Sequence, residues 1–180
     1  RLAGCNQRSV VGPVIVSAIG APPAMVDPGR AELGGPSRLL LDSVAQGLVR
    51  FDAAGQIAPA LAERWIVIDD GMSYIFRLRE ATWRDGSKVT AAQVVQRLRR
   101  QLGPRSRNAL RPYLSAIDEI VEMTPQVIEV RLKRPRLDLL KLFAQPELAV
   151  IDERLDSGSG PFRIKSRGKI TVLLRPAIDP

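Results

Sequence analysis

The stretch from Pro59 to Arg100 constrains the fold most, because strand, turn and helix signals follow one another in it without a gap. Apart from Ile75, residues 73–79 alternate between apolar and polar side chains, and this period of two indicates a half-buried strand. The apolar run 65–68 precedes this strand, and Asp70-Gly71 separates the two. Because Asp and Gly tolerate positive φ, the arrangement predicts a β-hairpin.

A second turn and a capped helix follow the hairpin. Asp85-Gly86 predicts the turn for the same backbone reason. Thr90 and Gln93 then have the spacing of a capping box, in which the hydroxyl accepts from the amide three residues on and the Gln side chain reaches back to the cap amide. The expected helix buries one apolar stripe, made of Val94, Val95 and Leu98.

In this order and spacing the stretch resembles the family 5 extracellular solute-binding proteins, which are receptors of ATP-binding-cassette importers for oligopeptides, dipeptides, nickel and related solutes. Arg84 stands where the family often has His or Ser, and Gln93 where it usually has Asp, and neither change breaks the turn or the cap. The positions that match the family pattern are Pro59, Leu61, Ala62, Trp65, Asp70, Gly71, Tyr74, Phe76, Leu78, Arg79, Asp85, Gly86, Thr90, Ala91 and Val94.

The resemblance covers nearly all of the chain but only the first part of the family's length. Residues 42–52 look like the family's helix leading into Gly-Leu-Val, residues 20–28 like its first loop, and residues 158–162 like its Gly-Thr-Gly-Pro-Tyr segment. The resemblance implies an α/β (α+β mixed) lobe of the type II periplasmic-binding-protein fold, with a mixed sheet, flanking helices and an added hairpin-rich subdomain. The second lobe of that fold is expected to lie outside this chain.

The residue types that are rare in the chain limit its chemistry. It has no His and one Cys, which argues against the usual zinc, haem and iron–sulfur sites and against Ser-His-Asp or Cys-His catalysis. Asp70 and Asp85 each precede Gly in a turn, so turn chemistry explains both carboxylates. We therefore expect no cofactor, no metal site and no catalytic residue.

The single cysteine, Cys5, follows Leu2-Ala3-Gly4, which matches the site at which bacterial lipoprotein signal peptides are cut before a lipidated cysteine. The alternative is an ordinary cysteine near a frayed terminus. The absence of an initiating Met and of an apolar leader indicates a fragment or a trimmed chain. With the resemblance, this pattern favours a lipid-anchored protein in the periplasm or cell envelope, outside the inner membrane.

Positive charge is concentrated in one region of a chain whose net charge is +8. A solvated face that complements the dipole of the preceding helix is the simplest explanation. Attraction to anionic headgroups is a second. A basic cell-envelope protein that binds nucleic acid through this region is the alternative function, although neither a recognition motif nor an aromatic stacking platform accompanies it. The cluster consists of Arg97, Arg99, Arg100, Arg105, Arg107 and Arg111.

Apolar runs between turn residues predict the remaining elements. Val14–Ile19 reads as a buried first strand, and Ser37 as the cap of a helix that buries Leu40, Leu41, Val44 and Leu48. Four aromatic residues, Trp65, Tyr74, Phe76 and Trp83, are expected in the core rather than in an aromatic cage. Further expected elements are a strand or short helix at 114–123, a strand at 127–132, a helix from Pro135 carrying Leu137, Leu140 and Phe143, a strand at 149–151, and a hairpin of 162–164 with 170–174.

The resemblance also divides the chain into four parts. Residues 1–13 are the lipobox and tether, and residues 14–58 the N-terminal part of the first-lobe core. Residues 59–151 are an inserted subdomain of that lobe. Residues 152–180 return to the core.

Two loops are candidates for ligand contact. Ligands of open α/β sheets bind beyond the carboxyl ends of strands, and the first expected strand ends at Gly20. Ala21, Pro22 and Pro23 are therefore a candidate cleft wall, with a purely structural connection as the equal alternative. The second loop is residues 105–113. In relatives it lies near the cleft rim, which makes Arg107, Asn108 and Tyr113 candidate contacts. The resemblance implies a solute-binding subunit that captures a small solute, with a peptide as the commonest family substrate, and delivers it to an ABC permease without binding nucleic acid.

Overall fold

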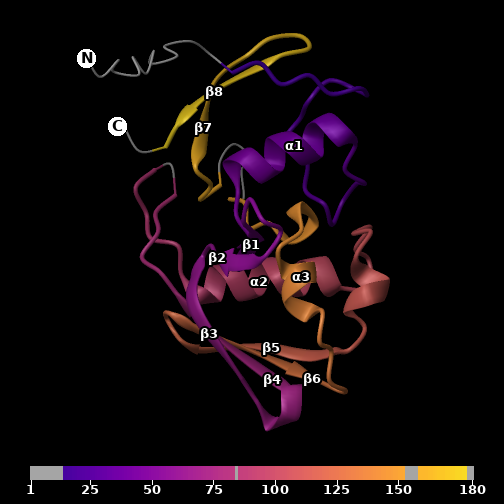
Figure 1. Cartoon of the computed structure of the whole chain (residues 1–180), viewed down its shortest axis with the longest axis vertical. Helices are drawn as coiled ribbons and strands as arrows, with labels where there is room; N and C mark the ends of the chain where they lie inside the picture. Colours follow the sequence, from indigo (N-terminus) through magenta and orange to yellow (C-terminus); the bar gives the residue numbers. More distant parts are fainter. Residues whose placement is uncertain (1–13, 84, 153–157, 178–180) are drawn as a thin grey trace, which may run out of the picture.

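The computed structural model describes residues 14–83, 85–152 and 158–177, which form three small sheets with helices between them (Figure 1). The elements are α1 Gly35–Val44, β1 Val49–Phe51, β2 Ile57–Pro59, β3 Ala62–Ile68, η1 Asp69–Gly71, β4 Ser73–Leu78, α2 Ala91–Leu102, η2 Arg111–Leu114, β5 Ile117–Thr124, β6 Val127–Leu132, α3 Leu139–Phe143, η3 Pro146–Leu148, β7 Phe162–Arg167 and β8 Val172–Pro176. The β7–β8 hairpin and the segment 14–20 lie at the top of Figure 1, α1 lies beneath them, and a four-stranded sheet lies at the bottom.

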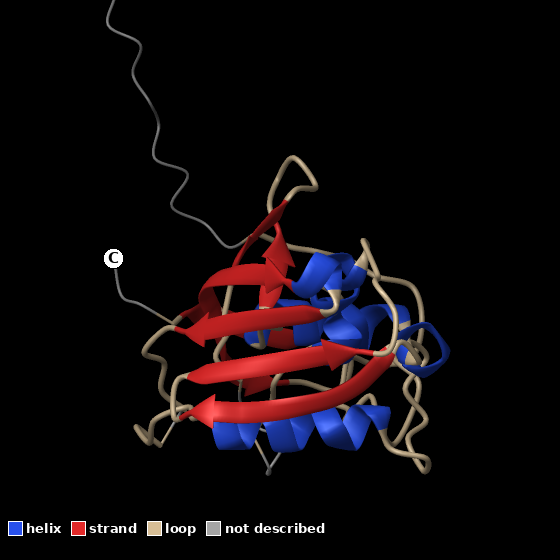
Figure 2. Ribbon diagram, turned by 90° about the horizontal axis from the view of Figure 1, so that it is seen from below, coloured by secondary structure: helices blue, strands red, loops and turns tan. Residues whose placement is uncertain are grey.

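The predicted hairpin is confirmed and forms half of the four-stranded antiparallel sheet, whose order is β3-β4-β6-β5 (Figure 2). The connection between β3 and β4 is wider than a two-residue turn. Asp69, Asp70 and Gly71 form one 3-10 turn, with φ of 51°, 51° and 87°. All three residues therefore have left-handed backbone, which Asp and Gly adopt more readily than most residue types.

One face of this sheet packs against α2 and α3 and carries the main core. Phe76 of β4 and Ile128 and Val130 of β6 are fully buried there. The ring of Phe76 meets the ring of Phe143 edge-on, with the centroids 5.8 Å apart. The four aromatic residues predicted to pack in the core do so, with Tyr74, Phe76 and Trp83 buried and Trp65 partly buried against the cluster.

The capped helix is confirmed as α2. Thr90 Oγ1 accepts from the Gln93 amide at 3.4 Å, and Gln93 Oε1 accepts from the Thr90 amide at 3.1 Å. Trp83 Nε1 donates to the same Gln93 oxygen at 3.0 Å, which joins the preceding turn to the helix start. The predicted stripe is buried, so both the start and the inward face of α2 lie where the local signals placed them.

Several of the other predicted elements are confirmed with changed bounds. Residues 114–123, where strand and helix both fitted, form the end of η2 and most of strand β5. α3 begins at Leu139 rather than at Pro135, and Leu137 is exposed. The segment 149–151 contributes isolated bridges rather than a strand. The C-terminal hairpin is confirmed as β7–β8.

Two N-terminal predictions were wrong. Val14–Ile19 is extended but unpaired, and Val14 is 89% and Ile19 101% exposed, because none of the described strands bonds to this segment. Ser37 does not cap α1, which begins two residues earlier at Gly35. Its hydroxyl instead accepts from the Ala24 amide at 3.1 Å and so holds the preceding loop.

Every strand pairing among the described residues is antiparallel. The parallel pairs that a mixed sheet would contain do not occur among these residues. Helices interleaved with antiparallel sheets give the expected α+β architecture. None of the described helices is long and apolar enough to span a bilayer.

Candidate functional site

The first predicted ligand loop lies on the surface beside α1. Ala21 and Pro22 are exposed and Pro23 is half-buried. The loop leaves Gly20, whose φ is 144° and whose added Cβ would lie 2.9 Å from Pro36 Cδ. A side chain at position 20 would therefore meet the start of α1, which explains a glycine at this bend.

The second predicted loop contributes residues of different kinds. Arg107 is exposed, and Tyr113 is 56% exposed. Asn108, in contrast, is 4% exposed. Its Nδ2 donates to Gln101 Oε1 at 2.9 Å and to the Glu147 carbonyl at 2.7 Å, and its Oδ1 accepts from the Leu110 amide at 2.9 Å. Both polar atoms of the Asn108 side chain are thus hydrogen-bonded within the protein. Asn108 is therefore not a free amide at the surface.

A buried chain of hydrogen bonds continues from Asn108 to the first loop. Gln101, at the end of α2, donates from Nε2 to Asp27 Oδ1 at 2.9 Å. The same Asp27 oxygen accepts from the Gly29 amide at 2.8 Å. Asp27, Gln101 and Asn108 are each at most 5% exposed. We call these three side chains the polar bridge, because they join loops that are far apart in the sequence.

The backbone reinforces the polar bridge at Gly29. The Arg107 amide donates to the Gly29 carbonyl at 2.8 Å. A Cβ on Gly29 would lie 2.9 Å from Gln101 Oε1 and 3.2 Å from Asp27 Oδ1, so a larger residue would displace side chains of the polar bridge. The structure therefore joins the two predicted ligand loops next to the expected contact residues.

Glu147 extends the polar cluster toward α1. Its carboxylate pairs with Arg38 of α1, and its side chain is 4% exposed against 45% for Arg38. Its second oxygen, Oε2, has no hydrogen-bond partner among the described residues. The sequence assigned no role to Gln101 or Glu147, because Gln101 is one of several polar residues in α2 and a single acidic residue in a short turn carries no pattern. A buried partner 74 positions away, as between Asp27 and Gln101, is not visible from local spacing.

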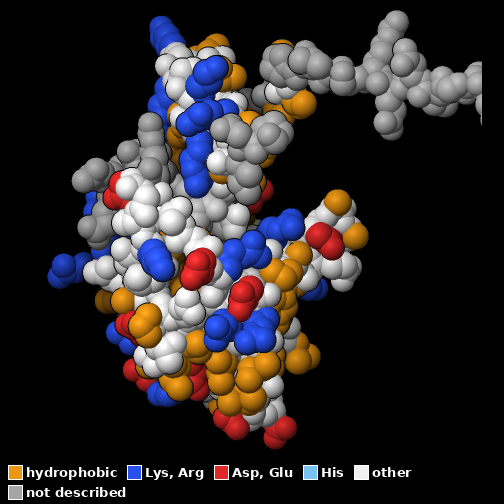
Figure 3. Space-filling model, turned by 90° about the vertical axis from the view of Figure 1, so that its left-hand side faces the viewer, with side chains coloured by type: hydrophobic (Ala, Val, Ile, Leu, Met, Phe, Trp, Pro, Cys, Tyr) orange, Lys and Arg blue, Asp and Glu red, His pale blue; other side chains and the backbone are white. Residues whose placement is uncertain are grey.

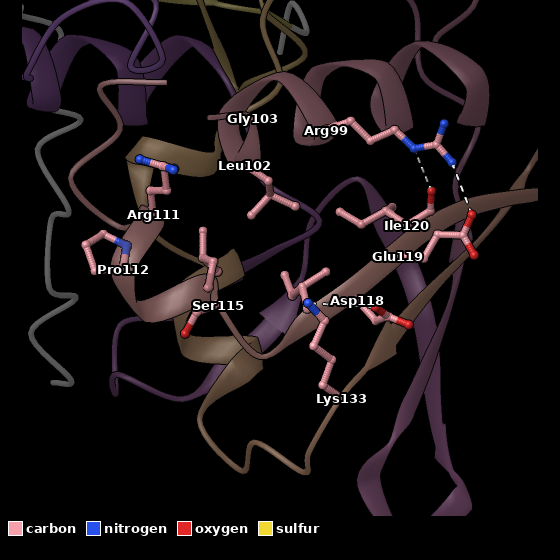
Figure 4. A pocket seen from close by; sticks show the side chains of 12 residues that line it. Arg99, Leu102, Gly103, Arg111, Pro112, Ser115, Asp118, Glu119, Ile120 and Lys133 are labelled. Carbon is pink, nitrogen blue, oxygen red and sulfur yellow. Dashed lines mark hydrogen bonds and ion pairs between the residues drawn. The ribbon is translucent and has the colours of Figure 1, made fainter. Parts of the chain in front are cut away.

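A pocket of about 730 Å³ lies elsewhere, between the end of α2, η2 and the start of β5 (Figure 4). Charged side chains compensate each other there. Arg99 donates from Nε to the Ile120 carbonyl at 2.9 Å and lies 3.9 Å from Glu119, and Lys133 lies 3.9 Å from Asp118. The pocket contains none of the six predicted contact residues.

The arginines of the cluster at 97–111 differ in burial and in their partners. Arg97 is 8% exposed, and Arg99 is engaged with Ile120 and Glu119. Arg107 and Arg111 are exposed. One of the six arginines is therefore buried and another is engaged with the sheet.

A more strongly basic surface lies on the β7–β8 hairpin, where Lys and Arg side chains gather at the top of the molecule (Figure 3). Arg163 is directly opposite Arg175 in the register, and burial lowers the pKa of Arg163. Like charges in directly opposite positions destabilise a hairpin. The cations of this hairpin, for which the described part of the chain supplies no ion pair, are Arg163, Lys165, Arg167, Lys169 and Arg175.

Metal-ligating side chains do not converge in the described ranges, which hold no group of three or more His, Cys, Asp or Glu residues placed to bind a metal ion. Cys5 lies outside the described residues.

Comparison with known proteins places this geometry in a family. Residues 56–175 match the family model of the bacterial extracellular solute-binding proteins, family 5 Middle. The chain is 37% identical over 94 residues to the probable deoxycholate-binding periplasmic protein YgiS of Escherichia coli K12, covering 52% of this chain and 17% of that protein. It is 33% identical over 124 residues to the periplasmic oligopeptide-binding protein OppA of Haemophilus influenzae, covering 68% and 22%. It is 31% identical over 140 residues to the glutathione-binding protein GsiB of E. coli K12, covering 76% and 27%.

Solved structures share the fold. The E. coli murein tripeptide binding protein MppA superposes with a TM-score of 0.76 at 23% identity, over 88% of this chain and 37% of that one. The A. tumefaciens R10 protein AgaA, solved with agropinic acid, gives a TM-score of 0.73 at 27% identity, over 83% and 32%. The chain thus spans between about a sixth and two-fifths of these relatives. It belongs to the bacterial extracellular solute-binding proteins of family 5.

Proposed function

We propose that the chain is part of the solute-binding receptor subunit of an ABC importer, which captures a small solute and delivers it to a membrane permease. The observation that carries the proposal is the family match over residues 56–175, which includes the whole four-stranded sheet and α2. A peptide is the proposed solute class. Relatives named for oligopeptide, dipeptide and glutathione binding support it.

The proposed ligand contacts are Ala21, Pro22 and Pro23 on one loop and Arg107 and Tyr113 on the other. Asn108 was also predicted from the sequence, but its side-chain hydrogen bonds lie within the protein. Exposure supports most of them as surface contacts, since Ala21, Pro22, Arg107 and Tyr113 face solvent. The two prolines restrict the backbone of the first loop, which lowers the ordering cost of binding. Arg107 and Tyr113 offer a cation and an amphipathic ring to a peptide carboxylate or side chain.

We propose that binding proceeds by closure of two lobes around the solute, without covalent chemistry. In this proposal the chain supplies much of the first lobe, divided as 14–58 and 152–180 for the core and 59–151 for the subdomain. The unpaired, exposed segment Val14–Ile19 supports a lobe that is completed by further polypeptide. So does the β7–β8 hairpin, whose facing Arg163 and Arg175 lack a counter-charge within the described residues.

The proposed location is the periplasm, as for the relatives whose names carry that word. We propose further that Cys5 is the lipidated residue of an envelope-anchored protein. Mass spectrometry of the mature N-terminus tests this point directly, since an unmodified Cys5 thiol in native membranes would exclude the anchor.

A thermal-shift screen of the natural polypeptide that contains these 180 residues, at whatever length its gene encodes, tests the function. A ligand present at about 100 times its Kd stabilises the folded state by about 2.7 kcal/mol. We expect di- to pentapeptides to raise Tm and nucleic acid to leave it unchanged. If neither a peptide nor any other small solute raises Tm, the receptor proposal is contradicted.

The basic-surface alternative receives no support from the comparisons, and salt separates it from the receptor. Binding to phosphates weakens steeply with rising salt, whereas capture of a neutral peptide in a cleft responds little. We expect the peptide-induced shift in Tm to persist from about 50 to about 500 mM salt, a range that brackets physiological ionic strength.

A further inference from the structure

We infer that the polar bridge of Asp27, Gln101 and Asn108 positions the two ligand loops relative to each other, and that these three side chains act in recognition without touching the solute. The inference rests on the proposed function, since it assigns a role within the proposed site. It gives Asn108 a different task from that of a direct contact.

Every side-chain N and O atom of Gln101 and Asn108 has a hydrogen-bond partner within the protein, and both Asp27 oxygens have partners. Gln101 uses Oε1 as acceptor from Asn108 and Nε2 as donor to Asp27. Asn108 uses Oδ1 once and Nδ2 twice. Asp27 Oδ1 accepts two bonds, and its Oδ2 lies 3.7 Å from the Arg30 guanidinium. Buried groups with partners inside the protein hold structure, while the exposed residues beside them remain available to a solute.

The bridge sits at the points where the ligand loops meet the rigid scaffold. Asp27 lies four residues after Pro23, and Asn108 follows Arg107 directly and precedes Tyr113 by five. Gln101 belongs to the last turn of α2, whose buried face is fixed in the main core. The helix end therefore acts as the common reference for both loops.

Removing the middle of the bridge takes one hydrogen bond from each of two buried groups, because Asp27 Oδ1 keeps only the Gly29 amide and Asn108 Nδ2 keeps only the Glu147 carbonyl. The loops can restore the lost hydrogen bonds by separating and admitting water. The apolar contacts of α2 do not depend on Gln101, so the helix itself stays in place. Local loosening of the loops, with the sheet unaffected, is the specific consequence.

The test compares Gln101→Leu with a control, Ser73→Ala, in the natural polypeptide. Ser73 Oγ donates to Glu129 Oε1 at 2.8 Å in a buried bond within the sheet, away from both loops. Amide hydrogen exchange is measured at Arg107, whose amide is bonded to the Gly29 carbonyl, and at sheet positions of β4 and β6. Kd for trialanine, or for the best peptide of the screen, is measured on the same samples.

We expect Gln101→Leu to raise exchange at Arg107 at least tenfold, as order of magnitude, and to weaken peptide binding by a similar factor, with the sheet amides unchanged. Ser73→Ala should lower global stability while changing Kd less than about twofold. Unchanged exchange at Arg107 in Gln101→Leu would show that the bridge does not hold the loops. Faster exchange with an unchanged Kd would show that it holds them without serving recognition.

A second variant makes amide exchange and peptide affinity depend on pH, which loss of a purely structural contact would not do. Gln101→Glu places a carboxylate within 2.9 Å of Asp27 Oδ1 but keeps the acceptor for Asn108. At pH of about 7.5 the two carboxylates repel, while at about pH 5 a proton shared by the pair restores the donor. The other charged groups nearby are Arg30 beside Asp27 and the Arg38–Glu147 pair, which are the same in wild type.

We compare Gln101→Glu with wild type at each pH. Between about pH 7.5 and about pH 5, the protection of the Arg107 amide and the peptide affinity of the variant should each recover by at least about tenfold. A variant as impaired at pH 5 as at pH 7.5 would contradict the inference. If wild type binds no peptide, the proposed function fails, and the exchange measurements still decide whether the bridge holds the loops.

Discussion

Gly160→Ala is predicted to destabilise the protein through a contact that has nothing to do with glycine's backbone freedom. Gly160 belongs to the segment that returns to α1, and its amide donates to the Val44 carbonyl oxygen at 3.0 Å. A Cβ at this position would lie 2.3 Å from the Val44 carbonyl carbon and 2.5 Å from the Ala45 amide nitrogen. Optimal separation of such atoms is about 3.5–4.0 Å, so the segment must move by more than about 1 Å.

That movement has two costs. Overpacking against backbone atoms costs about 1–3 kcal/mol, and losing the hydrogen bond to Val44 costs about 0.5–1.5 kcal/mol. We therefore expect a loss of about 2–4 kcal/mol in the free energy of unfolding. Urea denaturation followed by circular dichroism measures it as a shift in midpoint at constant m-value.

Gly103→Ala is the matched control for this substitution. Gly103 caps α2 with φ of −60°, and the nearest atom to an added Cβ, the Arg100 carbonyl oxygen, is 3.4 Å away. A compatible Gly→Ala change stabilises by about 0.4–1 kcal/mol, because the unfolded chain loses freedom. The two variants should thus shift stability in opposite directions. Equal stability of both would refute the contact argument.

Three further predictions concern the main core, the start of α2 and the sheet. Phe76→Ala should cost about 3–5 kcal/mol in urea unfolding because the ring is fully buried, whereas Phe51→Ala, at a ring that is 37% exposed, should cost clearly less. Thr90→Ala removes the confirmed cap and should cost about 1 kcal/mol, with the loss appearing as faster exchange in the first turn of α2; an unchanged first turn would contradict this. Hydrogen bonds from Arg131 and Ser73 lower the pKa of Glu129. The contribution of the Glu129 carboxylate to stability is therefore present above the unfolded pKa of about 4.3 and is lost as pH falls through the lower folded pKa. The difference in unfolding free energy between wild type and Glu129→Gln should narrow below about pH 4, and a difference independent of pH would contradict the assignment.

Local signals predicted the hairpin and α2 well because they act over a few residues. The Asp70-Gly71 turn, the alternation in β4 and the capping box each depend on neighbours within four positions, and the structure has all three. Even there the turn was longer than predicted, because Asp69 also adopts positive φ. A dipeptide signal marks where the chain turns but not how many residues take part.

Predictions that needed distant partners were less successful. Val14–Ile19 has the composition of a buried strand, but burial requires a neighbouring strand, and none of those in the described residues pairs with it. Ser37 satisfies the pattern of a helix cap, yet its hydroxyl serves a loop 13 residues earlier. A local pattern cannot distinguish the two uses of one hydroxyl.

The candidate site shows the same division. The two loops were identified from prolines, from the end of an expected strand and from the resemblance. Their connection through Asp27, Gln101 and Asn108 was not, because it joins three segments over separations of 74 and 7 residues. Whether Ala21, Pro22, Pro23, Arg107 and Tyr113 touch a solute stays a prediction.

The central claim is that these residues are part of a solute-binding lobe whose exposed N-terminal segment is covered in the natural polypeptide. Amide hydrogen exchange at residues 14–19 tests it most directly, in the 180-residue chain alone and in the natural polypeptide. We predict fast exchange in the chain alone, where the segment is unpaired, and protection by at least about a hundredfold in the natural polypeptide, where a neighbouring strand bonds to it. Equally fast exchange in both would contradict the account.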